Sequence, residues 1–408
     1  MWPCHIEIRG RSPAVIGARG FGCNVCGRPT STALDAAALL ADLVAIDSVN
    51  PALVPGAAGE AQIADYVATW LRERGLEVTV VDEPAGRPSI VAVARGSGGG
   101  ASLMLNGHTD TVGVAGMERA HEPRISAGRL YGRGAYDMKG GVAACMLAGA
   151  AAVGAGLRGD VIVTAVADEE HASAGVQAVL RRFGADACVV TEPTGLRACV
   201  AHKGFVWAQL EVRGRAAHGS RPDLGVDAIA GIGPVLAGIG ALQARLEAAP
   251  HPLLGPASLH AALIEGGQEL SSYPARCVVA IERRTLPGER IDAVRRELEQ
   301  LLELAREADP RLHTELRIGL QRDPFEVDPG SEVVAVLRAA ARDVLGSEPQ
   351  IVGDHPWMDA AFTSAAGIPT VVFGPGGAGA HALEEYGDIA SVERCAAVLS
   401  ETARRLCA

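Results

Sequence analysis

The stretch LMLNGHTD, residues 103–110, decides the fold, because an apolar run ends there abruptly in polar side chains. We expect a strand that delivers His108, and two residues later Asp110, to the edge of a sheet. Sites in open α/β sheets form just beyond the carboxyl ends of strands. His108 is therefore a candidate metal ligand, and Asp110 a candidate support for such a ligand. The alternative is a hydrogen-bonded surface histidine, since His-x-Asp also arises by chance.

The residues on both sides of this stretch alternate between helix and strand patterns. Apolar residues have helical spacing over 33–46 and 60–75, and an Ala-rich helix is expected over 139–153. Continuous β-branched runs at 160–167 and 187–191 predict buried strands. The alternation predicts an α/β domain of three layers (αβα), with a largely parallel sheet covered by helices on both faces.

The order of patterns changes between residues 204 and 322. It becomes strand, helix, strand, strand, helix, strand, which is the βαββαβ order of a ferredoxin-like unit. These patterns fall at residues 205–214, 225–248, 258–264, 277–286, 289–307 and 312–320. The α/β pattern then resumes, at residues 331–345, 357–366, 370–373 and 391–406. We therefore predict a compact domain over 204–322, inserted into an α/β domain made of residues 31–203 and 323–408.

Composition limits the classes of protein to consider. The chain has 408 residues, 48% of them hydrophobic and 21% charged, as expected of a globular protein with two domains. A formal net charge of -11 leaves no basic surplus for nucleic acid or an anionic membrane surface. We also expect no apolar run long enough to span a bilayer. Small molecules are the expected ligands.

Cysteine usage indicates a reducing compartment. The nine cysteines are an odd number, and most stand singly in apolar surroundings, as Cys145, Cys188 and Cys277 do. This pattern favours buried free thiols over a disulfide framework. A cytoplasmic location follows as an expectation.

Residues 1–30 differ from the rest, because they are rich in Gly and Arg and show no helix or strand periodicity. We expect a disordered extension there. The alternative is a small zinc knuckle built from Cys4, His5, Cys23 and Cys26. A single CxxC is a weak signal for zinc, so the first interpretation is preferred.

Further polar side chains follow the other predicted strands and turns. Together with His108 they make a set of candidate metal ligands: His108, Asp137, Glu170, Glu192 and His381. Two imidazoles and three carboxylates suit two adjacent zinc, manganese or cobalt ions, with one carboxylate bridging them. The carboxylate next to Glu170, that of Glu169, is then free to act as a general base.

Each member of this set also has an ordinary structural interpretation. An Asp-Glu-Glu triplet after a strand is commonly a solvated loop, Glu192 can lie beside a helix N-terminus, and His381 can be a loop residue. The joint occurrence at the strand ends of one domain, in the order His, Asp, Glu-Glu, Glu, His, favours the metal site.

Five motifs in this chain resemble those of a known family. GHTDTV, GRGAYDMKGG, ADEEHASAG, TEPTG and GAHALEEY are similar to motifs of the family that contains acetylornithine deacetylase, succinyl-diaminopimelate desuccinylase, aminoacylase and carboxypeptidase G. The resemblance runs from Thr32 to the C-terminus. It implies a zinc-exopeptidase-like catalytic domain with two divalent ions per subunit, zinc or else cobalt or manganese.

The resemblance also implies roles for the candidate residues. His108 and Glu192 would bind one ion, Glu170 and His381 the other, and Asp137 would bridge them. In the same scheme Asp110 orients His108. Glu169 would be the general base and proton shuttle.

The inserted domain over 204–322 resembles the lid domain of this family, and two of its residues match the family as well. His218 in AAHGSRP resembles a histidine that reaches the active site of a neighbouring subunit and stabilises the oxyanion; its alternative is a turn or helix-capping residue. Arg284 in ERRTLPGE resembles the arginine that grips a substrate carboxylate, with Arg283 and Arg276 as alternatives. Ser271 stands where the family often has Asn. The resemblance implies a homodimer formed through the lid.

The function expected from these features is metal-dependent removal of the acyl group from an N-acyl amino acid. The first alternative is a dipeptidase or carboxypeptidase with the same chemistry. The residues that distinguish these functions are those of the acyl pocket, which is expected in the variable loops 114–124 and 354–360. A non-catalytic amino-acid or peptide binder would have lost ligands or the base, and all are present. GRGAYDMKGG lacks both the P-loop Lys-Ser pair and a GxGxxG, which argues against a nucleotide site.

Overall fold

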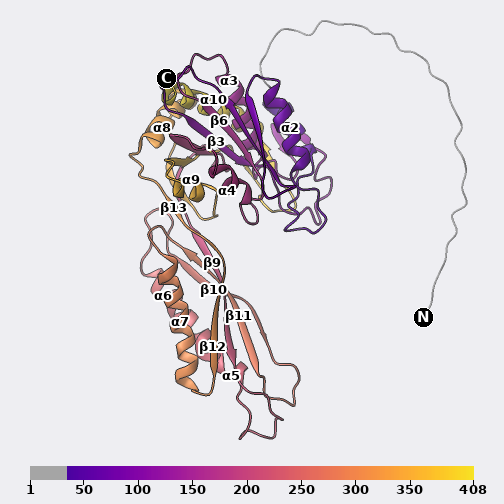
Figure 1. Ribbon diagram of the computed structural model, residues 1–408, viewed down its shortest axis with the longest axis vertical. Helices are drawn as coiled ribbons and strands as arrows, with labels where there is room; N and C mark the ends of the chain where they lie inside the picture. The colour runs from indigo at the N-terminus through magenta and orange to yellow at the C-terminus, as the bar shows by residue number, and fades with distance from the viewer. Residues whose placement is uncertain (1–34) are drawn as a thin grey trace, which may run out of the picture. The chain divides into compact units, whose positions relative to one another are not determined.

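The computed structural model describes residues 35–408. Its strands form one large sheet, a four-stranded lid sheet and a small four-stranded sheet. Strands β3 and β6 of the large sheet and β9 to β12 of the lid sheet are labelled in Figure 1. The expectations for residues 1–30, the disordered extension and the knuckle, lie outside the described residues.

The large sheet has nine strands in the order β1-β2-β6-β3-β7-β15-β8-β13, with β14 beside β8. Its strands are β1 (Glu77–Asp82), β2 (Pro88–Ala94), β3 (Leu103–His108), β6 (Val161–Val166), β7 (Ala187–Val190), β8 (Ala198–His202), β13 (Phe325–Glu326), β14 (Ile351–Asp354) and β15 (Thr370–Val372). The central strands β6, β3, β7 and β15 are parallel, but β1, β2, β8 and β13 pair antiparallel. The expectation of a largely parallel sheet is therefore wrong at both edges. Strands β1 and β2 are joined by a short turn, which only antiparallel neighbours permit.

Helices cover both faces of this sheet, as the three-layer prediction required. One core joins the sheet to five helices, which are α1 (Ala36–Ala45), α2 (Ala61–Arg72), α3 (Lys139–Ala152), α8 (Glu332–Leu345) and α10 (Ile389–Leu406). The opposite face packs on α4 (Ala174–Leu180) and α9 (Ala360–Ala365). Alternation along β2 supplies both cores, with Ile90 facing one and Val91 the other. A Cβ on Gly141 of α3 would lie 2.2 Å from the carbonyl oxygen of Thr191, so glycine lets α3 approach the strand ends.

The lid sheet is antiparallel in the order β10-β11-β9-β12. Its strands are β9 (Gly204–Arg213), β10 (Ser258–Gly266), β11 (Arg276–Thr285) and β12 (His313–Arg322). Its helices are α5 (Ala228–Gly231), α6 (Gly233–Glu247) and α7 (Ile291–Ala308). The order is the predicted βαββαβ. The single helix expected over 225–248 is divided at Ile232, because Pro234 in the first turn of α6 has no N–H with which to continue α5.

Residues 228–247 are long and apolar enough to cross a membrane by length and composition, with a mean hydropathy of 1.4. This corrects the expectation that no run reaches that length. In the fold, α6 buries Val235, Ile239 and Leu242 in the core beneath the lid sheet. Only 33% of the apolar window of this run is buried inside the protein, so packing on the lid core accounts for one face of the helix.

The small sheet brings two distant segments together. It has the order β16-β17-β5-β4, from β4 (Arg124–Ser126), β5 (Arg129–Tyr131), β16 (Gly377–Ala378) and β17 (Tyr386–Asp388). Strand β5 leads into the turn that carries Asp137, and the hairpin of β16 and β17 carries His381. Pairing of β5 with β17 therefore sets these two candidate ligands beside each other.

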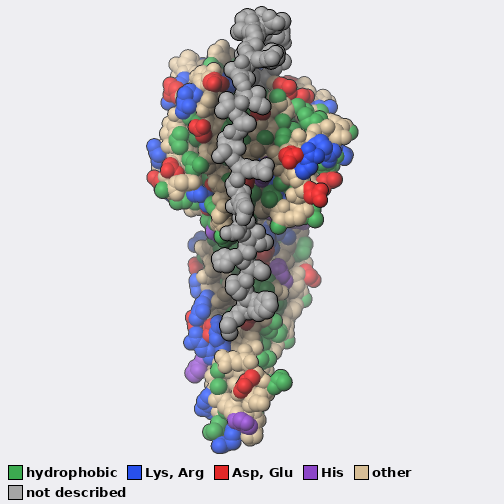
Figure 2. Space-filling view, turned by 90° about the vertical axis from the view of Figure 1, so that its right-hand side faces the viewer, with side chains coloured by type: hydrophobic (Ala, Val, Ile, Leu, Met, Phe, Trp, Pro, Cys, Tyr) green, Lys and Arg blue, Asp and Glu red, His purple; other side chains and the backbone are tan. Residues whose placement is uncertain are grey.

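The described cysteines are free and buried, which confirms the thiol prediction for this part of the chain. They are Cys145, Cys188, Cys199, Cys277, Cys395 and Cys407. On the surface, positive and negative side chains are interspersed over the face shown in Figure 2. This mixture is typical of a surface in contact with water.

Candidate metal centre

All five predicted ligands meet at one place. His108 is the last residue of β3, and Glu192 follows β7 by two residues. Glu170 comes from the turn after β6, Asp137 from the turn before α3, and His381 from the hairpin between β16 and β17. The parallel strands end at one edge of the sheet, so their polar ends converge there.

The distances between these side chains have the values expected for shared ligation. His108 Nε2 lies 3.2 Å from Asp137 Oδ1 and 3.5 Å from Glu192 Oε1. His381 Nε2 lies 3.4 Å from Asp137 Oδ2 and 3.1 Å from Glu170 Oε2. Two atoms that each lie about 2.1 Å from one tetrahedral ion are about 3.4 Å apart. The two oxygens of Asp137 face different imidazoles, which is the arrangement that a bridging carboxylate requires.

The pKa shifts of the two imidazoles favour their positively charged forms at the place where metal ions are expected. Hydrogen bonds with Asp137 and Glu170 raise the pKa of His381 to about 10. Burial works against protonation of His108, but the neighbouring Glu192 and Asp137 carboxylates raise its pKa well above the usual range. The same two imidazoles hold the pKa of Asp137 below its ordinary value against the effect of burial. Divalent ions would displace these protons, since metal ligands must be deprotonated.

The donor set fits divalent ions. Two groups of three side chains bring their ligand atoms within 4.8 Å of one another, His108 with Glu169 and Glu192, and His108 with Asp137 and Glu170. Glu170 Oε1 is buried and has no hydrogen-bond partner in the described part of the chain. A buried carboxylate oxygen without a partner is costly unless it has a ligand to bind. Imidazole and carboxylate together suit zinc, cobalt or manganese.

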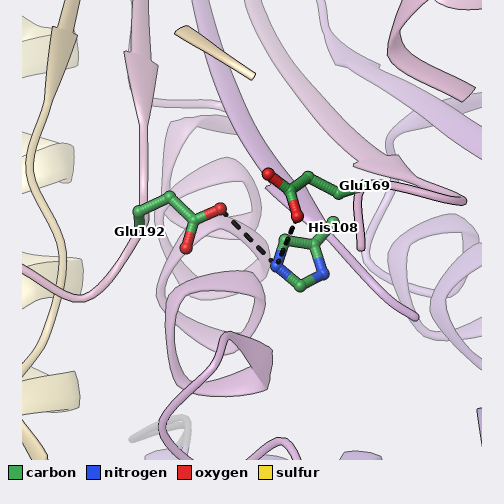
Figure 3. Close-up of side chains that lie close together, drawn as sticks. All are labelled: His108, Glu169 and Glu192. Atoms are coloured by element: carbon green, nitrogen blue, oxygen red, sulfur yellow. Dashed lines mark ion pairs between the residues drawn. The ribbon is translucent and has the colours of Figure 1, made fainter. Parts of the chain in front are cut away.

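Glu169 lies at the same centre but slightly farther out. Its Oε2 is 3.9 Å from His108 Nε2, and Figure 3 shows the Glu169 and Glu192 carboxylates both directed at that nitrogen. Burial raises the pKa of Glu169 well above its ordinary value, and the nearby Glu192 adds to the effect. A carboxylate with a raised pKa can take up and return a proton near neutral pH.

Asp110 contacts the centre through both its main chain and its side chain. The Nδ1 of His108 lies 3.0 Å from the backbone carbonyl oxygen of Asp110, whereas the nearest carboxylate oxygen is at 3.6 Å. The carboxylate instead accepts the backbone N–H groups of Glu169 at 3.0 Å and Glu170 at 3.1 Å. The main chain of Asp110 thus contacts the imidazole, and its side chain contacts the Glu169-Glu170 turn.

A buried network behind this turn was not predicted. Asn50 Nδ2 donates to Asp110 Oδ2 at 2.8 Å and to Asp168 Oδ1 at 3.1 Å. Arg87 Nη2 donates to the same Asp168 oxygen at 3.0 Å and also pairs with Glu60. These residues come from four separate loops, and no local pattern marks them. The one available signal was the Asn-Pro pair at 50–51, which favours a turn.

Glu385 fixes the segment that carries Asp137. It is 1% exposed and accepts the backbone N–H groups of Tyr136 at 2.9 Å and Asp137 at 3.0 Å, and Arg133 Nη1 at 2.6 Å. Because Glu385 follows His381 by four residues, this contact ties the two sides of the centre together. The GAHALEEY motif contained this residue, but its role was not predicted.

The centre opens into a cavity of about 380 Å³. Four of the candidate ligands line it, Asp137, Glu170, Glu192 and His381, together with Glu169. The other residues around it are Tyr136, Pro193, Asp354, Pro356, Trp357, Met358 and Ala380. Four of these seven belong to the 354–360 loop, one of the two segments expected to hold the acyl pocket. Residues of the 114–124 loop do not line this cavity.

The structure does not bring the two predicted lid residues to this cavity. His218 is exposed, and its Nδ1 lies 2.8 Å from Ser220 Oγ. Arg284 pairs with Glu282 and stands over the ring of Phe205 at 5.2 Å. The alternative Arg283 is fully buried in the lid, paired with glutamates of its own domain. The role expected of His218 involves a second subunit.

A cluster of two imidazoles, one buried and one exposed, with buried or partly buried carboxylates at a sheet edge and a further carboxylate of raised pKa beside it, is typical of a metal-dependent hydrolase. The family model described as Peptidase family M20/M25/M40 matches residues 104–405. An acetylornithine deacetylase from Myxococcus xanthus is 31% identical over 386 residues, which cover 91% of this chain and 97% of that protein. The chain therefore belongs to the peptidase family M20/M25/M40.

Two further comparisons agree with this assignment. An N-formyl-4-amino-5-aminomethyl-2-methylpyrimidine deformylase from Halalkalibacterium halodurans is 28% identical, covering 84% of this chain and 88% of its own. The crystal structure of an aminopeptidase PepT from Bacillus cereus has a TM-score of 0.74 at 20% identity, covering 91% of this chain and 98% of that chain. The structural match shows that the fold, catalytic domain with lid, is shared.

Proposed function

We propose that this protein is a two-metal hydrolase that removes the acyl group from an N-acyl amino acid. The observation that carries the proposal is the position of Asp137, whose two oxygens face His108 and His381 at 3.2 and 3.4 Å. In this proposal His108 and Glu192 would hold one ion, Glu170 and His381 would hold the other, and Asp137 would contribute one oxygen to each. Zinc is the proposed metal, with cobalt or manganese as alternatives.

The bound ions would polarise the amide carbonyl and make water more acidic. The chain's own part is proton transfer and orientation. Glu169 takes one proton from the water that adds to the carbonyl carbon, and delivers it to the nitrogen as the C–N bond breaks. Its raised pKa suits both halves of this exchange. Asp110 keeps Glu169 in place through the backbone N–H contact at 3.0 Å.

The proposed substrate is a small molecule with a free carboxylate. Arg284 is proposed to bind that carboxylate and His218 to reach the cavity of a partner subunit, in a homodimer formed through the lid. The domain limits proposed from the sequence, a lid over 204–322 between catalytic segments 31–203 and 323–408, are supported by β9 beginning at Gly204 and β12 ending at Arg322. A reducing, cytoplasmic location is supported by the buried free thiols.

Deacylation is preferred because two relatives are named for the removal of an acetyl or a formyl group. The second candidate is a dipeptidase. It is favoured by one observation, the carboxylate of Asp354 in the cavity, to which a free amino group can bind.

The test is amine release from N-acetyl and N-succinyl amino acids and from unblocked dipeptides. Each reaction is run with added zinc or cobalt and with a chelator. Chelator-sensitive release from the acyl compounds is expected. Preference for dipeptides would move the assignment to a peptidase, and no release from any compound would contradict the proposed function.

A further inference from the structure

One side chain links the last residue of a lid strand to the turn that carries the proposed base. Arg322 ends β12, and its Nη2 donates to the backbone carbonyl oxygen of Ala172 at 2.7 Å. Ala172 follows Glu169 by three residues. Because the lid sheet runs from Gly204 to Arg322, this bond lies where the chain passes from the lid back to the catalytic domain.

Two aromatic rings of the catalytic domain hold the guanidinium of Arg322. Its Cζ lies 5.4 Å from the ring centroid of Trp357 and 5.4 Å from that of Phe362. The two rings meet edge-on, with centroids 5.4 Å apart and an interplanar angle of 79°. Trp357 Nε1 also donates to the carbonyl oxygen of Asp323, the next residue after Arg322, at 3.0 Å. Cation–π contacts and a hydrogen bond therefore fasten the end of β12 to the catalytic domain.

The turn that receives the bond from Arg322 has an uncommon backbone conformation. Asp168 and Ser173, at its two ends, have φ values of 69° and 51°, in the left-handed region that residues other than glycine rarely adopt. Such conformations persist where surrounding contacts hold them. The Asp110 carboxylate holds the first half of the turn. The carbonyl oxygen in its second half accepts from Gln177 Nε2 of α4 at 3.0 Å and from Arg322, the partner that comes from the lid.

The guanidinium also brings a positive charge close to the acids of this region. Burial lowers the pKa of Arg322, and the negative charges of Asp359, Glu169 and Asp168 oppose this effect. A substitution of Arg322 can therefore act on the base in two ways, through its position or through the local charge. The two effects differ in their dependence on pH, because position does not change with the protonation of the base.

We propose that Arg322 is a positioning residue for catalysis, which joins lid strand β12 to the turn of Glu169 and so keeps the general base aligned with the lid. The inference rests on the proposed function, and it adds a residue that acts through Glu169 and not on the substrate. Misplacement of a reacting group by about 1 Å can cost about 100-fold in rate. Loss of the Arg322 contact should therefore lower kcat and leave substrate binding unchanged.

The first experiment measures kcat and KM of zinc-loaded Arg322→Met with an N-acetyl amino acid. The kcat should fall by about 10- to 100-fold, while KM and zinc content stay as in the wild type. In a Glu169→Gln background the same substitution should reduce kcat by less than about 3-fold, because the residue through which it acts is already lost. An equal reduction in both backgrounds is expected of a merely structural role and would overturn the proposal. Full recovery of kcat at another pH would also overturn it, since that result would show an effect of charge.

The second experiment follows amide hydrogen exchange, which needs no substrate. In Arg322→Met, exchange over residues 168–177 should be faster than in the wild type, and exchange over β3 should be unchanged. The matched control is Arg317→Met, because Arg317 lies on the same strand, is 48% exposed and pairs with Glu315 within the lid at 2.7 Å. This control should leave both exchange and kcat as in the wild type. Unchanged exchange over 168–177 in Arg322→Met would overturn the link.

The two experiments separate this proposal from the proposed function. Turnover in the wild type with an unchanged kcat in Arg322→Met would overturn the positioning role and leave the proposed function standing. Absence of turnover in the wild type, with N-acyl amino acids and with dipeptides, would overturn the proposed function instead. The link between β12 and the turn is then decided by hydrogen exchange alone, with the outcomes already given.

Discussion

Replacement of Arg87 by methionine tests whether the ion pairs of Arg87 with Glu60 and Asp168 stabilise the folded protein. The guanidinium contacts Glu60 through Nε and Nη2, both at 2.5 Å, and Asp168 through Nη2 at 3.0 Å. The Glu60 side chain is fully buried, that of Asp168 is 5% exposed and that of Arg87 14%. Arg87→Met therefore leaves two buried carboxylates facing an apolar side chain.

The expected loss is large because both carboxylates are out of water. Breaking a buried ion pair by removing one partner costs about 3–5 kcal/mol. Burial already raises the pKa of Glu60 in the presence of Arg87, so uptake of a proton by Glu60 should limit the loss to about 3 kcal/mol at pH 7. The loss should be larger at pH 8 and smaller at pH 5, where protonated carboxyl groups are favoured.

The assay is urea unfolding of the metal-free protein, followed by circular dichroism. Arg181→Met is the matched control, because Arg181 pairs with Glu83 where the two side chains are 61% and 53% exposed. Such a surface pair contributes about 0–1 kcal/mol. Arg87→Lys, which keeps the positive charge, should recover part of the stability. A loss in Arg87→Met no greater than that in Arg181→Met would refute the reasoning.

Three further predictions concern the base, a buried histidine and the packing of α3. Glu169→Gln should reduce turnover by about 10²- to 10⁴-fold while zinc content, measured by mass spectrometry, stays the same; full turnover would exclude the general-base role. Burial lowers the pKa of His202 to about 4, so stability is fully present above pH about 6.5 and is lost as the pH falls towards 4, by up to about 3 kcal/mol. His202→Phe should flatten the pH dependence of the melting temperature in that window, and an unchanged slope would contradict this. Gly141→Ala sets a Cβ 2.2 Å from the Thr191 carbonyl oxygen and should cost about 1–3 kcal/mol in thermal unfolding; a neutral result would show that α3 can shift freely.

Sequence patterns were sufficient for the buried strands that end at His108 and shortly before Glu169 and Glu170. The buried strands over 103–108 and 161–166 are continuous apolar runs that end in polar residues, and this local signal predicts both the strand and the place of its functional side chain. The amphipathic helix α7 and the alternating strand β12 were predictable for the same reason. The order of these patterns then predicted the inserted lid.

Features that depend on tertiary contacts were not predictable in this way. The contact of Asp110 with the N–H groups of the Glu169-Glu170 turn spans about 60 residues of chain, and only the fold brings the partners together. Strands of two or three residues, such as β16 and β5, are too short to show a period. The antiparallel edges of the sheet depend on which strands become neighbours, which local sequence does not determine.

The most direct test of the central claim, that His108, Asp137, Glu170, Glu192 and His381 hold two divalent ions, is to titrate the chelated protein with zinc. Bound metal is counted by mass spectrometry while turnover of an N-acetyl amino acid is followed. We predict two zinc ions per chain, with turnover appearing as they bind, and loss of one ion in His381→Ala. Full turnover of the metal-free protein, or no bound zinc at equimolar concentration, would contradict the account.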